Sequence, residues 1–374
     1  MAPPTKNIRA EDDILVRVEN VVKHFPVKAG GFVRHTVGHV HAVDDVSLVV
    51  ERGKTLGLVG ETGSGKSTLA RCVAGLIPVT KGKVIFNGTE ITRLSRGAMR
   101  PLRREVQMIF QDPYSSLNPR RRVGSIIGDP FAIHKTATGA ERKRKVQELM
   151  ERVGLNPEHF NRFPSEFSGG QRQRIGVARA LALKPKLIIC DEPVSALDVS
   201  IQAQVLNLLS DLQSEYGLSY LFIAHDLEVV RHVSDKVAVM YLGRIGEAAP
   251  ADDLYDKPCH PYTVALLSAA PAADPDTAAA RQRIILTGDV PSPIDPPMGC
   301  RFHPRCPKAQ EICSRVEPPL VRNPGTETEG KSATDVPGGW AHVTACHFPV
   351  LPGENLTTAG AATPAATVSK GELA

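Results

Sequence analysis

The residues Gly60-Glu61-Thr62-Gly63-Ser64-Gly65-Lys66-Ser67 follow the pattern G-x-x-x-x-G-K-S. An apolar run of strand character, Thr55 to Val59, comes before them, and a run of helical character begins at Thr68. A strand, a glycine loop and a helix in this order form a phosphate-binding loop, because glycines let backbone N–H groups converge on phosphate oxygens. We expect Lys66 to reach the terminal phosphates of a nucleotide and Ser67 to ligate Mg²⁺. The alternative, an ordinary glycine-rich turn before a helix, does not account for the full eight-residue pattern.

A second part of the same site is predicted at the end of the apolar run Leu187-Ile188-Ile189-Cys190. A buried strand that ends in Asp191 places this carboxylate where it can hold Mg²⁺, and Glu192 lies one residue nearer the phosphates. Glu192 is then the natural general base for the attacking water. An acidic helix N-cap is the alternative interpretation, and the glycine loop upstream weighs against it.

The composition describes a chain of 374 residues, of which 42% are hydrophobic and 23% charged. This leaves room for one large globular domain and a smaller one. No apolar run reaches the roughly 18 to 20 residues needed to cross a bilayer, and the charged N-terminus lacks the apolar core of a signal peptide. The net charge of +5 is modest, and we interpret the basic runs at 100–104 and 120–122 as solvated faces. We therefore expect a cytosolic chain with no nucleic-acid partner.

Runs of strand and helix character alternate along the chain, which favours an α/β fold. Strands are expected at 14–18, 46–50, 187–190 and 219–224, with an extended hairpin joining the first two. Helices are expected at 139–155, 174–183 and 201–216. Residues 271–280 are mostly Ala, Asp and Pro and are expected to form a linker, while the polar end of the chain carries no pattern that predicts folding.

Ser168-Gly169-Gly170-Gln171, directly before a predicted helix, resembles the signature sequence of ATP-binding-cassette (ABC) proteins. The other motifs of this family appear in their usual order between about residues 14 and 250. Gln111 resembles the loop glutamine that senses Mg²⁺ and the attacking water. Asp198, in Ser195-Ala196-Leu197-Asp198, resembles the dimer-interface loop, and His225 resembles the switch histidine that contacts the γ-phosphate.

This resemblance implies a RecA-like P-loop core with an antiparallel β subdomain and a helical subdomain at about 112–175. It also implies that Phe25 stacks on adenine, a role for which His24 is a weaker candidate. The residues implied to bind ATP are Phe25, Gly60, Glu61, Thr62, Gly63, Ser64, Gly65, Lys66, Ser67 and Thr68. The implied Mg²⁺ ligands are Ser67, Gln111 and Asp191, and the implied catalytic residues are Glu192, His225 and Gln111.

Two cassettes are needed for the chemistry that the resemblance implies. Ser168 and the N–H groups at the following helix N-terminus make a γ-phosphate site, but the signature, Ser168 to Gln171, faces the glycine loop of a partner chain. ATP is then buried between two cassettes, and hydrolysis releases them. Because Glu192 and His225 are both present, we expect a competent site.

The C-terminal part resembles an extension of ATP-binding subunits of oligopeptide and dipeptide importers. The resemblance rests on Lys257-Pro258-Cys259-His260-Pro261-Tyr262-Thr263 and on the Pro- and Cys-rich segment from Gly288. The stretches Phe25-Pro26-Val27-Lys28, Ala42-Val43-Asp44-Asp45-Val46-Ser47 and Gln111 to Pro119 resemble the second of the two non-identical ATP-binding subunits of such importers. The implied partners are a homologous ATP-binding subunit in a heterodimer, two transmembrane permeases and an extracytoplasmic peptide-binding protein. The implied location is peripheral, at the cytoplasmic face of the inner membrane.

Domains are expected at 12–250 for the cassette and at 251–350 for the extension, with a disordered tail at 351–374. Near relatives import nickel or other small solutes, so the cargo stays open at this stage. Two other classes also stay open: a soluble cassette acting on ribosomes or nucleic acid, and a cassette of another transporter, including an exporter.

Six of the seven cysteines fall into two groups, and the seventh, Cys259, has no cysteine near it in the sequence. Cys72 and Cys190 fall in predicted core elements and are expected to be buried thiols. Four others cluster late in the chain, at Cys300, Cys306, Cys313 and Cys346. Their wide spacing lacks the C-x₂₋₄-C pair of most zinc sites and suits a bulkier centre. Because some extensions of this family hold a [4Fe–4S] cluster, we favour that cluster over zinc and over free thiols. We interpret His303, His342 and His347 as solvated loop residues, with hydrogen-bond donors beside the centre as the alternative.

Overall fold

The computed structural model describes residues 13–29, 35–112, 116–269, 284–323, 342–354 and 356. The predicted linker at 271–280 lies outside these residues, and so does most of the predicted disordered tail.

An eight-stranded sheet forms the centre of the molecule, in the order β11-β12-β10-β9-β3-β8-β7-β6. Its strands are β3 (Thr55–Val59), β6 (Val106–Ile109), β7 (Leu187–Asp191), β8 (Ser219–Ile223), β9 (Lys236–Tyr241), β10 (Arg244–Pro250), β11 (Val321–Arg322) and β12 (Val343–Thr344). The strands from β9 to β6 are parallel, so their carboxyl ends lie along one edge. This edge is where ligands bind in sheets of this kind.

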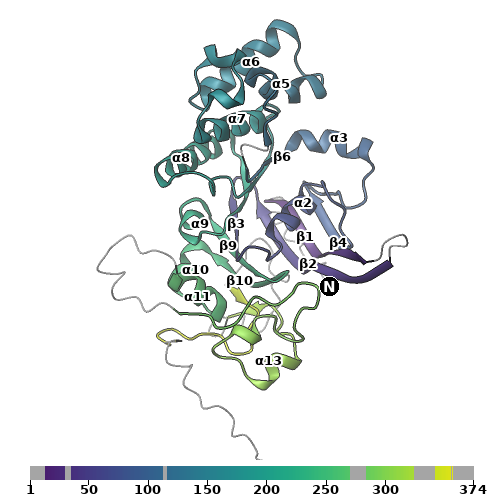
Figure 1. The fold of residues 1–374 in the computed structure, drawn as a ribbon, viewed down its shortest axis with the longest axis vertical. Helices are drawn as coiled ribbons and strands as arrows, with labels where there is room; N and C mark the ends of the chain where they lie inside the picture. The colour runs from purple at the N-terminus through teal and green to yellow at the C-terminus, as the bar shows by residue number, and fades with distance from the viewer. Residues whose placement is uncertain are drawn as a thin grey trace, which may run out of the picture.

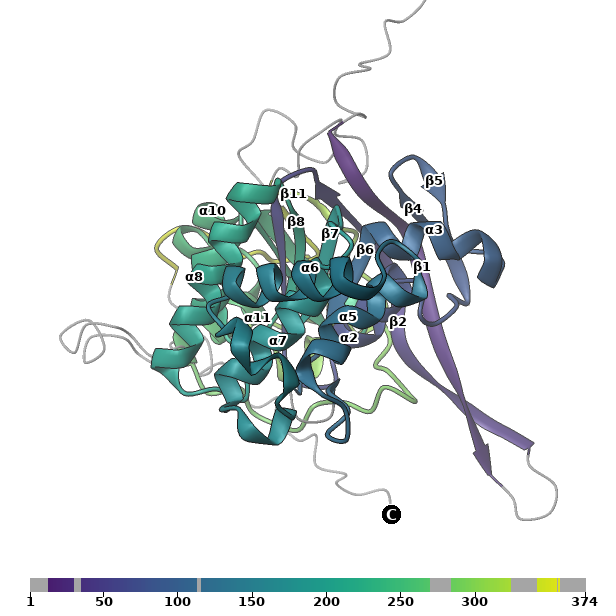
Figure 2. The same ribbon diagram turned by 90° about the horizontal axis from the view of Figure 1, so that it is seen from above.

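A second, antiparallel sheet has the order β2-β1-β4-β5. Its strands are β1 (Ile14–Ala29), β2 (His35–Glu51), β4 (Lys81–Phe86) and β5 (Thr89–Glu90). The paired ends of β1 and β2 project well beyond the body of the molecule (Figure 2). The predicted hairpin and the predicted antiparallel subdomain therefore correspond to one sheet.

Helices cover the central sheet and extend from it. They are α2 (Lys66–Val73), α3 (Arg96–Glu105), α5 (Val123–Ile133), α6 (Gly139–Arg152), α7 (Gly169–Leu181), α8 (Val199–Tyr216), α9 (Leu227–Val233), α10 (Ala251–Asp256), α11 (Pro261–Ala269) and α13 (Glu311–Arg315), with 3₁₀ turns at Pro157–Asn161, Pro164–Glu166 and His303–Arg305. Helices α5, α6 and α7 gather at one end of the long axis, and α13 lies at the other (Figure 1).

The parallel strands are buried on both faces, which explains why they read as continuous apolar runs. Alternate residues of β7 enter two different hydrophobic clusters. Ile188 packs with side chains of α5 to α8, whereas Ile189 packs with side chains of α2 and the antiparallel sheet. The central sheet is thus the layer between two cores.

The C-terminal segment contributes two short strands to this sheet. Strand β12 pairs antiparallel with β10, where Val343 lies opposite Ala248, and β11 pairs with β12. Phe302 and Tyr262 are fully buried in the same cluster as the helices of the core. The extension and the cassette therefore share one packed interior.

Candidate ATP site and cysteine cavity

The glycine loop joins β3 to α2, and its backbone adopts positive φ angles at glycine positions. Gly60 and Gly65 have φ angles of 150° and 106°, which other residues rarely adopt. A Cβ at Gly65 would lie 2.0 Å from the carbonyl oxygen of Ala42, and a Cβ at Gly60 would lie 2.0 Å from that of Met240. The loop is therefore held between β2 and β9, while Thr62 and Gly63 are exposed at its tip.

Lys66 lies inside this loop and is only 4% exposed. Its Nζ donates to the carbonyl oxygens of Gly60 (2.7 Å) and Glu61 (2.9 Å) and to Ser64 Oγ (3.3 Å). Burial lowers the pKa of Lys66, while nearby carboxylates act to raise it. The cation is thus fixed at the loop where nucleotide phosphates are expected to bind.

Oxygen ligands suited to Mg²⁺ lie beside the lysine. Ser67 Oγ donates to Asp191 Oδ1 at 2.7 Å, and Asp191 ends the buried strand β7. Burial raises the pKa of Asp191, and the hydrogen bond from Ser67 acts in the opposite direction. A hydroxyl and a carboxylate are hard oxygen donors, so this pair fits a magnesium ion. Thr68 follows in the first turn of α2, half-buried.

Three polar side chains meet at the carboxyl ends of β6, β7 and β8. Gln111 Nε2 donates to Glu192 Oε2 at 2.8 Å, and His225 Nδ1 lies 3.4 Å from the same oxygen. Each residue follows the end of a different parallel strand, and the register of the sheet brings the three strand ends together. Glu192 has a left-handed backbone with φ 47°, a strained conformation that is concentrated at functional sites.

The predicted signature forms the start of α7. Ser168 is the N-cap residue, and its Oγ accepts from the N–H of Gln171 at 3.3 Å. Gln171 Oε1 accepts in return from the N–H of Ser168 at 3.0 Å, which completes a capping box. A Cβ at Gly170 would lie 2.3 Å from Ile201 Cγ2, so the glycine lets α7 approach α8. Gly169, rather than the predicted Arg174, is therefore the first residue of the helix.

The predicted dimer loop lies at the start of α8. Asp198 is the N-cap residue and is exposed, and its side chain accepts no capping hydrogen bond from the described part of the helix. Val199, the next residue, is 83% exposed.

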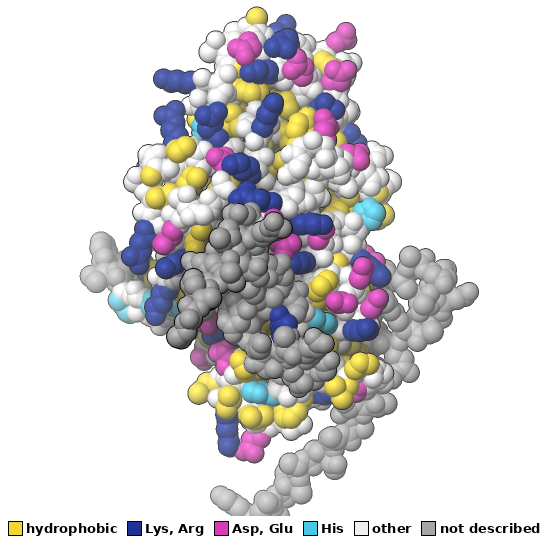
Figure 3. Space-filling model, turned by 180° about the vertical axis from the view of Figure 1, so that it is seen from behind, with side chains coloured by type: hydrophobic (Ala, Val, Ile, Leu, Met, Phe, Trp, Pro, Cys, Tyr) yellow, Lys and Arg dark blue, Asp and Glu magenta, His cyan; other side chains and the backbone are white. Residues whose placement is uncertain are grey.

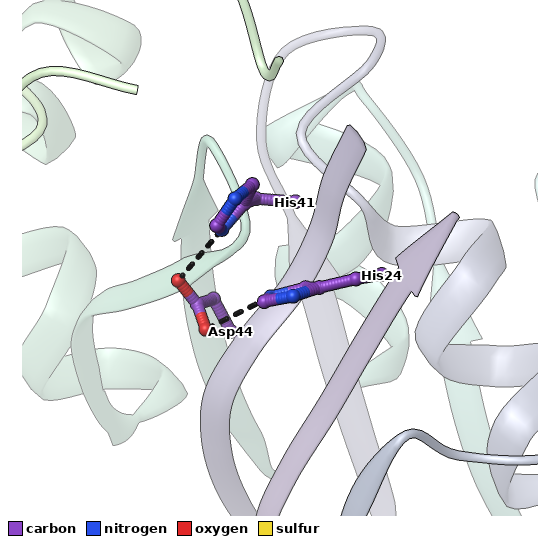
Figure 4. A group of neighbouring side chains, drawn as sticks. All are labelled: His24, His41 and Asp44. Carbon is purple, nitrogen blue, oxygen red and sulfur yellow. Dashed lines mark hydrogen bonds and ion pairs between the residues drawn. The ribbon is translucent and has the colours of Figure 1, made fainter. Parts of the chain in front are cut away.

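Phe25 and His24 are neighbours on β1, but their side chains have different surroundings. Phe25 is 37% exposed, and Lys23 Nζ lies 4.8 Å from its ring centroid. His24 Nε2 and His41 Nδ1 lie 3.2 and 3.4 Å from the carboxylate of Asp44, with the two rings 4.0 Å apart (Figure 4). Burial acts to raise the pKa of Asp44, but Arg301 and Arg244 hold it below its usual value. Phe25 is thus the more exposed of the two rings.

The four late cysteines line one cavity in the extension. Cys300, Cys306, Cys313 and Cys346 surround it together with His260, His303 and His347. All four thiols are free, and burial raises the pKa of Cys306 to about 12 and that of Cys346 to about 11. Among the described residues, two other groups bring three metal-ligand atoms within 4.8 Å of one another, and the four cysteines do not. Sulfur atoms bound to a single tetrahedral zinc would lie about 3.8 Å apart, so the four cysteines as they lie do not match such a zinc site.

The loop histidines do not all behave as predicted. His303 and His347 are half-buried at the cavity, with His303 Nδ1 2.8 Å from the carbonyl oxygen of Cys300. His342 lies elsewhere: its Nε2 is 2.6 Å from the buried carboxylate of Glu247. The prediction of a solvated residue was wrong for His342, because the extension packs against β10 and covers it.

The sequence of this chain matches two known protein families. The family described as ABC transporter matches residues 43–195, and the family described as oligopeptide/dipeptide transporter, C-terminal region, matches residues 247–313. The probable peptide ABC transporter ATP-binding protein y4tS of Sinorhizobium fredii is 55% identical over 312 residues, which are 83% of this chain and 88% of that protein. The oligopeptide transport ATP-binding protein AppF of Bacillus subtilis is 51% identical over 340 residues, 91% of this chain and 98% of that protein.

A solved structure of an ATP-binding cassette also resembles this chain. The dimeric post-hydrolysis state of the ATP-binding cassette MJ0796, bound to ADP and Pi, matches with a TM-score of 0.56 and 26% identity. The match covers 63% of this chain and 99% of that structure.

The chain belongs to the ATP-binding proteins of ABC transporters. The fold predicted for its cassette is confirmed, and this ABC protein is an ATPase. Within the residues that the structure describes, no helix combines the length and apolar character needed to span a membrane.

Three residues near the nucleotide loop of this ABC ATPase were not predicted. Arg71 Nη2 lies 4.0 Å from Asp191 Oδ2, and Tyr262 and Arg305 of the extension contact Glu61. Tyr262 lies in a quoted motif, but nothing in the sequence indicates what its hydroxyl contacts. Arg305 stands directly before Cys306, and its neighbour in space is 244 residues away.

Proposed function

We propose that this chain hydrolyses ATP to power the import of di- and oligopeptides through an ABC transporter. The observation that carries the proposal is the match of residues 247–313 to the C-terminal region of oligopeptide/dipeptide transporters, beside a complete cassette. The two relatives described above are both named as peptide transport proteins, so a peptide is a better-supported cargo than nickel.

At the nucleotide site, Glu192 would act as general base toward the attacking water. Gln111 and His225 both lie at its carboxylate and would orient it, the water and the γ-phosphate. Lys66 and the loop N–H groups would hold the phosphates, and Phe25 would stack on adenine. Ser67 and Asp191, with Gln111, would hold Mg²⁺, which neutralises phosphate charge when bound.

The working unit in this proposal is a heterodimer with a second, homologous ATP-binding subunit. The helix N-terminus at Ser168 and the residues Gly169 to Gln171 would complete the partner's ATP site. The exposed Asp198 and the largely exposed Val199 support an interface at this loop, since an apolar side chain so exposed gains stability when covered. ATP bound between the subunits would close the dimer, and hydrolysis would open it.

The further partners are two transmembrane permeases and an extracytoplasmic binding protein, which would place the chain at the cytoplasmic face of the inner membrane. We assign residues 12–250 to the cassette, 251–350 to the extension and 351–374 to a tail. On the face in Figure 3, Lys and Arg side chains lie among Asp and Glu side chains, so this face is not the uniformly basic surface expected where nucleic acid binds.

We also propose that Cys300, Cys306, Cys313 and Cys346 hold a [4Fe–4S] cluster with a structural role. The cavity that they share and the spread of their sulfur atoms support this assignment. Anaerobic purification should then give a brown protein that contains iron and sulfide. A colourless, iron-free and well-folded protein would remove the cluster from the proposal.

Co-purification from the native membrane tests the proposed function. The tagged full-length chain should bring down two multi-span permeases and a second ATP-binding subunit, and loss of the chain should abolish uptake of labelled peptides. Recovery with ribosomes or DNA, or with an exporter whose substrate leaves the cell, would contradict it.

A further inference from the structure

Two groups of Glu61 in the nucleotide loop, its backbone N–H and its carboxylate, form hydrogen bonds with the extension. Its N–H donates to Tyr262 Oη at 2.9 Å, and its carboxylate accepts from Arg305 Nη1 at 2.9 and 3.2 Å. Its carbonyl oxygen accepts from Lys66 Nζ, the cation of the loop itself. One residue thus connects the phosphate-binding lysine to two side chains that come from the C-terminal extension.

Arg305 is held in place by its own surroundings. Its side chain is 10% exposed, its Nη1 lies 3.3 Å from Tyr241 Oη, and its guanidinium lies 5.9 Å from the ring centroid of Tyr241. The rings of Tyr241, Tyr262 and Phe302 pack edge to face or tilted, with centroids 4.7 to 5.3 Å apart. A planar cation fixed by an aromatic group loses little freedom when it pairs with a carboxylate.

The charge of Glu61 is unfavourable for a loop that binds a polyanion. A carboxylate beside the phosphates repels them unless a cation neutralises it, and the repulsion is stronger where water is partly excluded. Arg305 supplies that cation at hydrogen-bonding distance, from the side of Glu61 that faces the extension. Lys66 keeps its own positive charge for the nucleotide.

We propose that Arg305 is a positioning residue for ATP binding. It neutralises Glu61 and, together with the Tyr262 hydroxyl, fixes the first half of the nucleotide loop, so the extension takes part in the nucleotide site. The inference rests on the ATP-binding role proposed above for this loop.

Equilibrium binding of Mg·ATP to the full-length chain tests this, measured by displacement of a fluorescent ATP analogue. Arg305→Met should raise the Kd for ATP about tenfold, because a partly buried carboxylate loses its partner. Arg315→Met is the matched control: this arginine pairs with Glu311, both are more than 70% exposed, and its loss should leave the Kd unchanged. Arg305→Lys keeps the charge and should stay within about threefold of wild type.

The double variant Glu61→Gln/Arg305→Met separates charge from structure. It removes the repelling carboxylate together with its partner, so the Kd should return to within about threefold of wild type. If Arg305 had a merely structural role, Arg305→Met would lower the melting temperature of the nucleotide-free chain, and adding Glu61→Gln would not restore the Kd for ATP.

Two results would overturn the inference: equal Kd values for Arg305→Met and Arg315→Met, or a double variant as weak as Arg305→Met alone. A wild-type chain that binds no ATP would instead overturn the proposed function of the loop.

Discussion

Glu192 shows how much the chemistry depends on single side chains. Its carboxylate has Gln111 on one side and His225 on the other, and its backbone lies in a conformation that few residues other than glycine adopt. The motifs indicate that these residues belong to one site, and the sheet brings them together because parallel strands end at the same edge. Arg71 and Arg305 could not be predicted, because they reach the site from other elements and carry no local pattern.

Glu192→Gln should retain ATP binding and lower turnover at this site by at least about a hundredfold, because an amide cannot accept the proton of the attacking water. Single-turnover hydrolysis in the assembled transporter, with ATP binding measured in parallel, checks this. Glu228→Gln is a suitable control, since Glu228 is exposed in α9 close to His225 in sequence. Full-rate hydrolysis at both sites with Glu192→Gln would mean that Glu192 is not the base.

Asp191→Asn should raise the Mg²⁺ concentration needed for half-maximal hydrolysis about tenfold, because a neutral amide holds the cation less tightly than a carboxylate. Ser67 Oγ can still donate to the amide oxygen, so the loop should keep its shape. A magnesium titration of ATPase activity provides the measurement, with the exposed Asp211→Asn on α8 as control. An unchanged magnesium requirement would exclude Asp191 as a ligand.

At the scale of elements, the sequence predicted the buried strands better than the helix ends. The strands β7 and β8 appear as apolar runs because both of their faces are covered. The predicted start of α7, Arg174, lies five residues too late, because the two glycines favour a loop while the capping box of Ser168 and Gln171 in fact starts the helix at Gly169. The two-residue strands β11 and β12 are too short to leave any periodic pattern.

The glycine loop allows a matched comparison at this scale. Gly63 has a φ of 83° with no atom within 4 Å of an added Cβ, whereas Gly65 has a φ of 106° and the Ala42 carbonyl at 2.0 Å. Gly63→Ala should therefore cost only backbone strain, about 1 to 2 kcal/mol. Gly65→Ala should cost clearly more, because α2 or β2 must also move. Thermal unfolding of the nucleotide-free chain ranks the two, and equal melting temperatures would contradict the packing argument.

For the whole molecule, the sequence separated the extension from the cassette and could not show how closely they pack. Their contacts join residues far apart in the chain, such as His342 with Glu247 and Arg301 with Asp44. Arg301 follows Cys300 and Arg305 precedes Cys306, so the cysteine segment carries two of the arginines that contact the cassette. Composition and spacing contain no information on such pairings.

Cys306→Ser should abolish iron binding and make residues 284–323 sensitive to protease while the cassette stays intact, because the proposed cluster would tie this segment together through metal–sulfur bonds. Iron analysis and limited proteolysis followed by mass spectrometry measure both effects. Cys72→Ser changes a buried thiol of α2 and serves as control, with iron retained. Unchanged proteolysis of Cys306→Ser would show that packing alone holds the extension.

The pairing of β12 with β10 also sets an order of events during synthesis. The ribosome makes β10 long before β12, and until the later strand emerges β10 presents an open hydrogen-bonding edge to other chains. A nascent chain in this state is prone to aggregate, because unpaired edges capture similar strands. Truncation before Val343 is therefore expected to lower the yield of soluble protein even where every residue of the ATP site is present.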